Sequence, residues 1–218
     1  LVTGSTSGIG LGIAQALAQE GAALLLNGFG EAAEIEKLRA DTAKKYAVRV
    51  AYSGADISKP DQVKAMVEQA HKELGSLDIL VNNAGVQFTS SVADFPDKEW
   101  ERLIAINLSG PFYTTRAAIP GMKARGWGRI INIASAHGLV ASAEKAGYVA
   151  AKHGVVGLTK VTALELANDG ITVNAICPGW VLTPLVQKQI DARAAADGKS
   201  AETMRDQLLS EKQAMVKF

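Results

Sequence analysis

Four residues have the types and spacing of an acid–base catalyst. Tyr148 and Lys152 lie four positions apart, so on a helix they share one face. An ammonium beside a phenol favours the phenolate, which suits a base that removes an alcohol proton. Ser135 follows an apolar run, where its hydroxyl can bind the substrate oxygen. Asn107 interrupts a helical segment, where asparagine is unfavourable, and either a functional helix distortion or a satisfied buried amide explains it.

A glycine-rich turn opens the chain. The segment from Leu1 to Gly10 has the pattern of a strand end, a turn and a helix start. Gly4, Gly8 and Gly10 permit a tight turn, and the helix beginning near Gly8 directs free N–H groups at an anion. An ordinary glycine loop is the alternative in a chain with 21 glycines. The position between a strand and a helix favours a dinucleotide phosphate.

The segment after the next predicted strand bears on which dinucleotide is bound. Dinucleotide folds place an acidic residue there for the ribose 2′-hydroxyl, whereas this chain has Asn27-Gly28-Phe29. Neither that segment nor Ser5-Thr6-Ser7 carries a Lys or Arg to neutralise a 2′-phosphate. We therefore expect NAD rather than NADP. Asp56-Ile57 either flanks the adenine or simply begins the next helix.

Short apolar runs alternate with longer segments of helical spacing along the chain. Runs that are apolar throughout predict strands buried on both faces, and therefore a parallel sheet covered by helices. The predicted fold is α/β, a Rossmann-type doubly wound parallel sheet with helices on both faces and ligands at the strand C-termini. The predicted strands are Ala22–Asn27, Val48–Tyr52, Ile79–Asn82, Arg129–Ala134 and Ile171–Ile176. The predicted helices are Ile9–Glu20, Glu31–Tyr46, Pro60–Leu74, Asp97–Arg125 and Tyr148–Asn168.

Composition excludes several classes of protein. The 218 residues fit one domain, and a net charge of +1 argues against an electrostatic nucleic-acid binder. The 48% apolar content excludes disorder. A single cysteine, Cys177, excludes an internal disulfide and, with 3 histidines, a Cys/His zinc site, so no metal is expected. No apolar run has the roughly 18 residues of a membrane helix, and a reducing cytoplasm fits best.

Five motifs occur in a distinctive order. They are Thr-Gly-x-x-x-Gly-x-Gly at Thr3–Gly10, Asn82-Asn83-Ala84-Gly85, Ser135, Tyr148-Val149-Ala150-Ala151-Lys152 and Pro178-Gly179. Together, and over Leu1 to about Thr183, the chain resembles the short-chain dehydrogenase/reductase family. The resemblance implies a Rossmann-type fold, a nicotinamide cofactor and a homotetramer with dimer contacts on the two longest predicted helices. Relative to the family pattern, the start of the first strand and the final helix, strand and glycine-rich tail are absent.

Positions matched to the family receive roles from the resemblance. Tyr148 is the implied acid/base, Lys152 binds the nicotinamide ribose and favours the tyrosine's phenolate, and Ser135 orients the substrate oxygen. Asn107 is implied to hold a water in a proton relay. We expect the cofactor to contact Gly4, Ser7, Gly8, Ile9, Gly10, Asn27, Phe29, Asp56, Ile57, Asn83, Ala84, Gly85, Tyr148, Lys152, Pro178, Gly179, Val181 and Thr183.

Further polar residues predict a carboxylate on the substrate. Gln87, His137, Lys145 and Gln189 supply one cation and several hydrogen-bond donors if they face the cleft, and Trp180 adds an apolar wall. The set resembles that of a subfamily acting on small 3-hydroxy acids, so we expect reversible oxidation of (R)-3-hydroxybutyrate to acetoacetate. The expected substrate-binding residues are Gln87, Ser135, His137, Lys145, Tyr148, Trp180 and Gln189.

The end of the chain and three alternative functions complete these expectations. The charged stretch Val181–Phe218 has helical spacing without a following strand, and we expect a lid over the substrate.

A 3-oxoacyl thioester reductase would prefer NADPH, and its sequence would carry a basic pair near the glycine turn. A sugar or acetoin dehydrogenase would not need Lys145. A non-catalytic NAD-sensing protein would be expected to lose Tyr148 or Lys152, and both are present.

Overall fold

The computed structural model describes residues 1–212, apart from the side chains of Leu185, Glu211 and Lys212. The chain divides into two compact units, Leu1–Cys177 and a second that begins at Pro178. Each unit is described by itself below. Residues 213–218 of the expected lid lie outside the described residues.

The first unit is built on parallel strands. Strand β1 (Leu24–Asn27) pairs with β2 (Val50–Ser53), and β3 (Ile79–Asn82), β4 (Gly128–Ile133) and β5 (Ile171–Ile176) pair in that order. Val2 forms parallel bridges to both Leu26 and Val81. The first residues of the chain therefore lie between β1 and β3 and join the two groups into one succession, β2-β1-Val2-β3-β4-β5. The strand order reverses at this central segment, which confirms the doubly wound fold.

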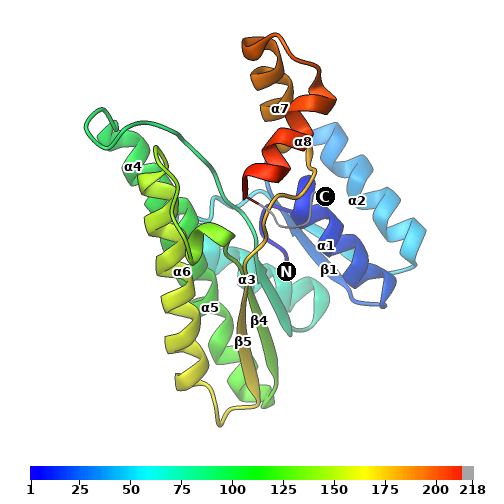
Figure 1. Ribbon diagram of the computed structural model, residues 1–218. Helices are drawn as coiled ribbons and strands as arrows, with labels where there is room; N and C mark the ends of the chain where they lie inside the picture. The colour runs from blue at the N-terminus through cyan, green and yellow to red at the C-terminus, as the bar shows by residue number, and fades with distance from the viewer. Residues whose placement is uncertain (213–218) are drawn as a thin grey trace. The chain divides into compact units, whose positions relative to one another are not determined.

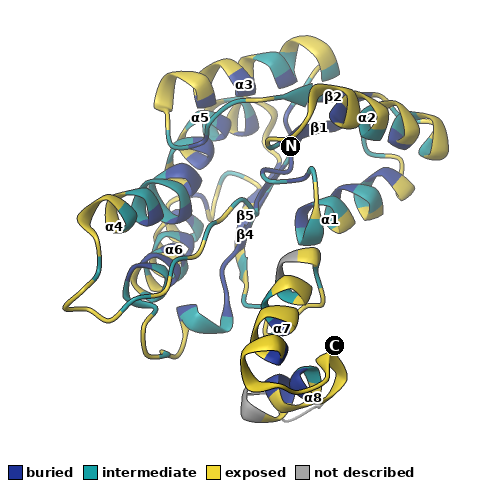
Figure 2. Cartoon of the chain, turned by 90° about the horizontal axis from the view of Figure 1, so that it is seen from above, coloured by how far each residue is buried: buried dark blue, intermediate teal, exposed yellow. Residues whose placement is uncertain are grey.

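Helices cover both faces of these strands, as Figure 1 shows. Alternate strand residues divide between two cores, because side chains along a strand point to opposite faces. Leu24, Leu26 and Val81 pack with α1 (Gly8–Gln19) and α2 (Ala32–Tyr46). Leu25, Leu80 and Ile130 pack with α3 (Pro60–Leu74) and α5 (Gly110–Arg125). In Figure 2 the helices turn their exposed residues outward, away from the buried strands.

The predicted helix Asp97–Arg125 is interrupted. It consists of α4 (Asp97–Ile104), a π-helical turn (Ala105–Ser109) and α5, so the chain has a local helix distortion at Asn107. Such turns inside α-helices often occur at functional sites. After β4 comes a short 3₁₀ turn (Ala136–Gly138) and then α6 (Ala146–Glu165). Helix α6 begins before Tyr148, which therefore lies in its first turn.

The second unit contains two helices. They are α7 (Pro184–Asp197) and α8 (Ala201–Lys212), separated by Gly198 with a positive φ of 63°. Ile190, Ala194, Met204 and Leu208 form a small core between them, against which Trp180 packs. Among residues 1–212, none of the helices combines the length and apolarity needed to cross a membrane.

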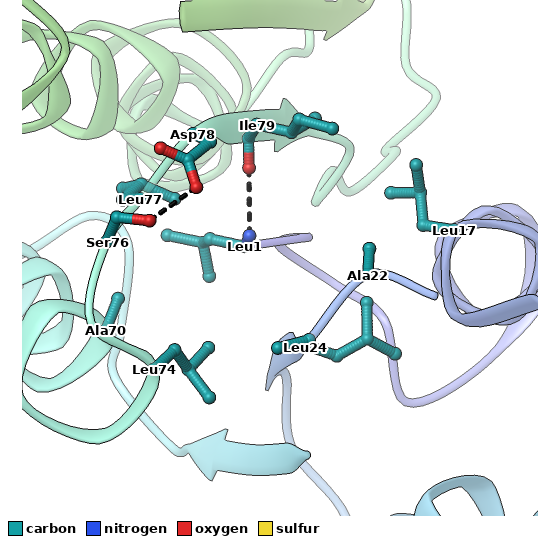
Figure 3. A pocket seen from close by; sticks show the side chains of 11 residues that line it. Leu1, Leu17, Ala22, Leu24, Ala70, Leu74, Ser76, Leu77, Asp78 and Ile79 are labelled. Carbon is teal, nitrogen blue, oxygen red and sulfur yellow. Dashed lines mark hydrogen bonds between the residues drawn. The ribbon is translucent and has the colours of Figure 1, made fainter. Parts of the chain in front are cut away.

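A pocket of about 140 Å³ lies at the amino ends of the central strands (Figure 3). The Leu1 nitrogen donates to the Ile79 carbonyl oxygen across 2.9 Å beside it, and Ser76 donates to Asp78. Because parallel strands place all their carboxyl ends at the other edge of the sheet, this pocket lies opposite the edge where ligands bind in such folds. The pocket therefore does not belong to the predicted site.

Candidate active site

Helix α6 brings Tyr148 and Lys152 together. Lys152 is buried, with 5% of its surface exposed, and its Nζ donates to the Ile133 carbonyl oxygen at the end of β4 across 2.7 Å. The same Nζ lies 5.6 Å from the centre of the half-buried Tyr148 ring. The lysine is thus tied to the strand end, while the tyrosine one turn earlier remains partly open to solvent. The predicted shared face of these two residues is confirmed.

Burial changes the proton affinity of Lys152. Removal from water lowers the pKa of its ammonium to about 8, against a smaller opposing Coulombic effect of Cys177. An amine with such a pKa holds and releases a proton near neutral pH, unlike a surface lysine. Nζ of Lys152 is therefore suited to proton exchange next to Tyr148.

The residues after β4 add a hydroxyl and an imidazole to the site. Ser135 is 9% exposed, and its Oγ accepts a hydrogen bond from the His137 backbone N–H at 3.1 Å, which caps the 3₁₀ turn. The His137 ring stands edge-on to the Tyr148 ring with centres 6.1 Å apart. His137 Nε2 is 2.8 Å from Ser142 Oγ. The structure thus gathers Ser135, His137 and Tyr148, as predicted from their positions after one strand and on one helix.

Asn107 lies in a helix distortion and is also a satisfied buried amide. It is buried within the π turn, and its Oδ1 accepts from the Val86 N–H at 3.0 Å while its Nδ2 donates to the Val86 carbonyl at 3.0 Å. A Cβ atom on Gly85 would lie 2.8 Å from that Oδ1, so only glycine fits there without a shift. The side chain of Asn107 therefore clamps the segment after β3. Its implied relay water stays a prediction.

The glycine turn has the shape of a phosphate cradle. Gly4 and Gly8 adopt positive φ angles of 62° and 56°. A Cβ atom on Gly10 would overlap the Gly4 carbonyl oxygen and Asn83 Nδ2, so the helix approaches the turn more closely than a side chain allows. Within residues 1–212, the exposed Ser7 makes no side-chain cap to α1. The first N–H groups of α1 next to Ile9 are therefore left for an anion.

Sequence reasoning missed one residue of this cradle, Thr3. Its Oγ1 accepts from the backbone N–H groups of Asn83 and Ala84 at 3.0 and 3.1 Å. In return, Asn83 Nδ2 donates to the carbonyls of Thr3 and Gly4 at 2.9 and 3.1 Å. These bonds join the glycine turn to the segment after β3. The threonine preceding Gly4 in the motif was the available signal.

The residues expected around the adenosine differ in what their side chains do. Asn27 is buried, and its Nδ2 donates to the carbonyls of Ser53 and Ala55 at 3.0 and 2.9 Å, which joins β1 to β2. Phe29 is 70% exposed. Asp56 Oδ1 accepts from the backbone and hydroxyl of Ser58 at 2.9 and 2.7 Å, within a turn that precedes α3. Because α3 begins at Pro60 with Lys59 as its N-cap, Asp56 does not begin that helix, and its place beside the adenine stays a prediction.

Ile57 is buried, and a Cβ atom on Gly110 would lie 2.8 Å from its Cδ1. Gln87 is exposed, in the segment that Asn107 clamps. Lys145 is half-buried and immediately precedes α6.

The remaining expected residues belong to the second unit, and their place in the site stays a prediction: Pro178, Gly179, Trp180, Val181, Thr183 and Gln189. Thr183 caps α7, since its Oγ1 accepts from the Val186 N–H at 3.3 Å.

The described residues fit a dinucleotide. The open helix N-terminus and the glycines at its approach suit a diphosphate, and the edge beside Tyr148 and Lys152 suits the reactive end of the molecule. Gly85 lies beside Lys152, since a Cβ atom there would be 3.8 Å from Lys152 Nζ. In the part of the chain that the structure describes, no three His, Cys, Asp or Glu side chains gather as a metal site.

Comparisons with known proteins agree with this arrangement. Residues 1–194 match the family model described as short chain dehydrogenase. The chain is 57% identical over 219 residues to D-beta-hydroxybutyrate dehydrogenase of Cupriavidus necator, covering 100% of this chain and 84% of that protein. The protein of the same name in Rhizobium meliloti is 53% identical over 218 residues, with 100% and 84% covered. L-Sorbose reductase from Gluconobacter frateurii, solved with NADPH and L-sorbose, is 31% identical with a TM-score of 0.94, covering 100% of this chain and 82% of that one.

Proposed function

Because the chain belongs to the short-chain dehydrogenase family, we propose that it catalyses the NAD-dependent interconversion of (R)-3-hydroxybutyrate and acetoacetate. The observation that carries the proposal is the placement of Tyr148 beside the buried Lys152. The two D-beta-hydroxybutyrate dehydrogenases, which resemble this chain over its whole length, support the choice of substrate.

Three side chains perform the proton chemistry. In the direction of oxidation, the Tyr148 phenolate oxygen takes the proton of the substrate hydroxyl while hydride leaves the carbon that bears this hydroxyl. Lys152 holds a proton at Nζ, 5.6 Å from the centre of the Tyr148 ring, and its positive charge stabilises the phenolate. Ser135 Oγ donates a hydrogen bond to the substrate oxygen as its charge changes. The bound nicotinamide supplies the hydride acceptor. In reduction, Tyr148 returns the proton.

The neutral segments near the ribose support NAD. Thr6 Oγ1 donates to the Phe29 carbonyl at 3.2 Å, and a Cβ atom on Gly28 would lie 2.6 Å from Thr6 Oγ1. The two neutral segments 5–7 and 27–29 are therefore in direct contact. A 2′-phosphate next to them would have no cation from either segment with which to form a charge-assisted hydrogen bond.

Polar side chains on both sides of Tyr148 support a carboxylate on the substrate. His137 lies against the tyrosine ring, and Lys145 is three residues before Tyr148. Gln87 comes from the segment that Asn107 clamps. We propose that Gln189 and Trp180 of the second unit complete this set, and that the segment from Val181 closes as a lid over the substrate.

Removal of the ammonium at position 145 should weaken acid binding selectively. We expect Lys145→Ala to raise KM for (R)-3-hydroxybutyrate about 10- to 100-fold, because a charge-assisted hydrogen bond is lost. KM for a neutral ketone should change little. Steady-state kinetics of both substrates test this, with Lys160→Ala on the exposed surface of α6 as the matched control. Equal changes in both KM values would remove Lys145 from the carboxylate site.

We propose that the protein is a cytoplasmic homotetramer acting in ketone-body metabolism. Exposed apolar side chains on the two long helices support contacts between copies: Phe112 on α5 is 42% exposed, and Val161 and Leu164 on α6 are 53% and 79% exposed. Such residues gather at interfaces between subunits.

A further inference from the structure

Gln87 lies between two fixed neighbours. The backbone N–H and carbonyl of Val86 both form hydrogen bonds with the side chain of Asn107. On the other side, the Phe88 ring packs edge-on against Phe95 with centres 5.5 Å apart, and Phe95 packs in the same way against Trp100 of α4 at 6.4 Å. Edge-to-face pairs at these distances are favourable. The backbone that carries Gln87 is therefore fixed, although its side chain is exposed.

The same segment is joined to the start of α6. The Ser90 N–H donates to the Glu144 carbonyl at 2.9 Å, and Ser90 forms a parallel bridge with Lys145. The segments that precede α4 and α6 thus lie side by side at this point (Figure 1). This backbone contact therefore relates the segment that carries Gln87 to the segment that carries Lys145.

The conformation of Glu144 makes this contact unusual. Its φ is +63°, a region that residues with a Cβ atom rarely adopt, and its side chain is exposed. The helix start beside it is also closely packed, because a Cβ atom on Gly147 would lie 2.8 Å from Leu103 Cδ1 and 3.4 Å from Phe95 Cζ. A strained residue held by its surroundings often marks a functional constraint.

We propose that the Ser90–Lys145 bridge is a specificity element, which holds Gln87 and Lys145 in one register beside Tyr148 so that both bind the substrate carboxylate together. The inference rests on the proposed function. Ser90 and Glu144 are positioning residues that act through backbone groups, since their own side chains are not needed for the contact. Preorganised partners bind more tightly because less ordering is needed when the substrate arrives.

Two variants at position 90 separate the backbone bond from the side chain. Ser90→Pro removes the N–H donor, whereas Ser90→Ala keeps it. We expect Ser90→Pro to raise KM for (R)-3-hydroxybutyrate about tenfold, because small displacements of binding groups are costly. The value of kcat at saturation and the Kd of NADH should stay within about twofold of the original protein. Ser90→Ala should resemble the original protein in all three measurements.

A second pair of variants, at position 144, tests the same contact even if the proline variant fails to fold. Glu144→Val and Glu144→Gly remove the same exposed carboxylate, but only glycine accepts the positive φ readily. We expect Glu144→Val to raise KM about tenfold and Glu144→Gly to leave it within about twofold. When Lys145→Ala is already present, Glu144→Val should have less than its separate effect, because part of that effect acts through the Lys145 ammonium.

Hydrogen exchange of the Ser90 amide measures the bridge without substrate. We expect protection in the original protein and in Glu144→Gly, and its loss in Glu144→Val. An unprotected Ser90 amide, equal KM values for the two variants at either position, or full additivity with Lys145→Ala would overturn the inference. If the original protein fails to oxidise the acid while the amide is protected, the proposed function fails and the bridge alone stands.

Discussion

Replacement of Tyr148 by phenylalanine should lower kcat by about 10³- to 10⁴-fold, near the upper end of what general acid–base catalysis contributes. The change removes one oxygen and keeps the ring that packs against His137. The Kd of NADH should change less than about twofold, because the hydroxyl takes part in proton transfer rather than in phosphate binding. Pre-steady-state kinetics and NADH fluorescence titration measure the two quantities.

The matched control is Tyr46→Phe, which makes the same change at the end of α2. Tyr46 packs into the core shared by α1 and α2, on the opposite face of the strands from α3 and α5. We expect this variant to turn over at the original rate. Substantial turnover by Tyr148→Phe would remove the tyrosine from its assigned role, even if the rest of the site stood.

Replacement of Gly10 by alanine should weaken NADH binding by about 100-fold or more. A Cβ atom there would overlap the Gly4 carbonyl oxygen and Asn83 Nδ2, so the glycine turn and α1 must move apart. Overpacking of this kind costs about 1–3 kcal/mol and displaces the groups that hold the phosphates. Fluorescence titration of NADH together with thermal unfolding separates lost binding from lost folding.

Gly12→Ala provides the control on the same helix. Among the described residues, no atom outside the helix backbone lies within 4 Å of a Cβ placed at Gly12. Alanine there should raise stability by about 1 kcal/mol through helix propensity and leave NADH binding unchanged. Similar Kd values for the Gly10 and Gly12 variants would contradict the phosphate cradle.

Much of the fold was predictable because its inner strands, such as β1, are buried on both faces. The expectation was wrong for β5, an outer strand in which alternate residues are exposed. Runs such as Leu24–Asn27 are apolar enough to identify as inner strands, and their alternation with helices predicts parallel pairing. The strand ends were less predictable, since the structure begins β1 at Leu24 rather than at Ala22. Such differences arise because hydrogen-bond geometry, not side-chain type, decides where a strand stops.

The candidate site was predictable where side-chain type carries the chemistry. Tyr148, Lys152 and Ser135 are brought to one strand end, as their spacing indicated. The contact between Ser90 and Glu144 was not predictable, because it joins backbone atoms far apart in the sequence and leaves no trace in side-chain type. The role of Asn107 was predictable in part. An asparagine inside a helical segment indicated a helix distortion, but it did not indicate that the side chain would bind Val86.

The most direct test of the account is NADH formation by the full-length protein with (R)-3-hydroxybutyrate and NAD. The (S) isomer, NADP and a neutral secondary alcohol serve as controls. The account predicts fast turnover only with the (R) acid and NAD, which would support the carboxylate site and the neutral ribose segments together. Turnover of the neutral alcohol but not of the acid would contradict the account, leaving the Tyr148 chemistry but discarding the assigned roles of Gln87, His137, Lys145 and Gln189.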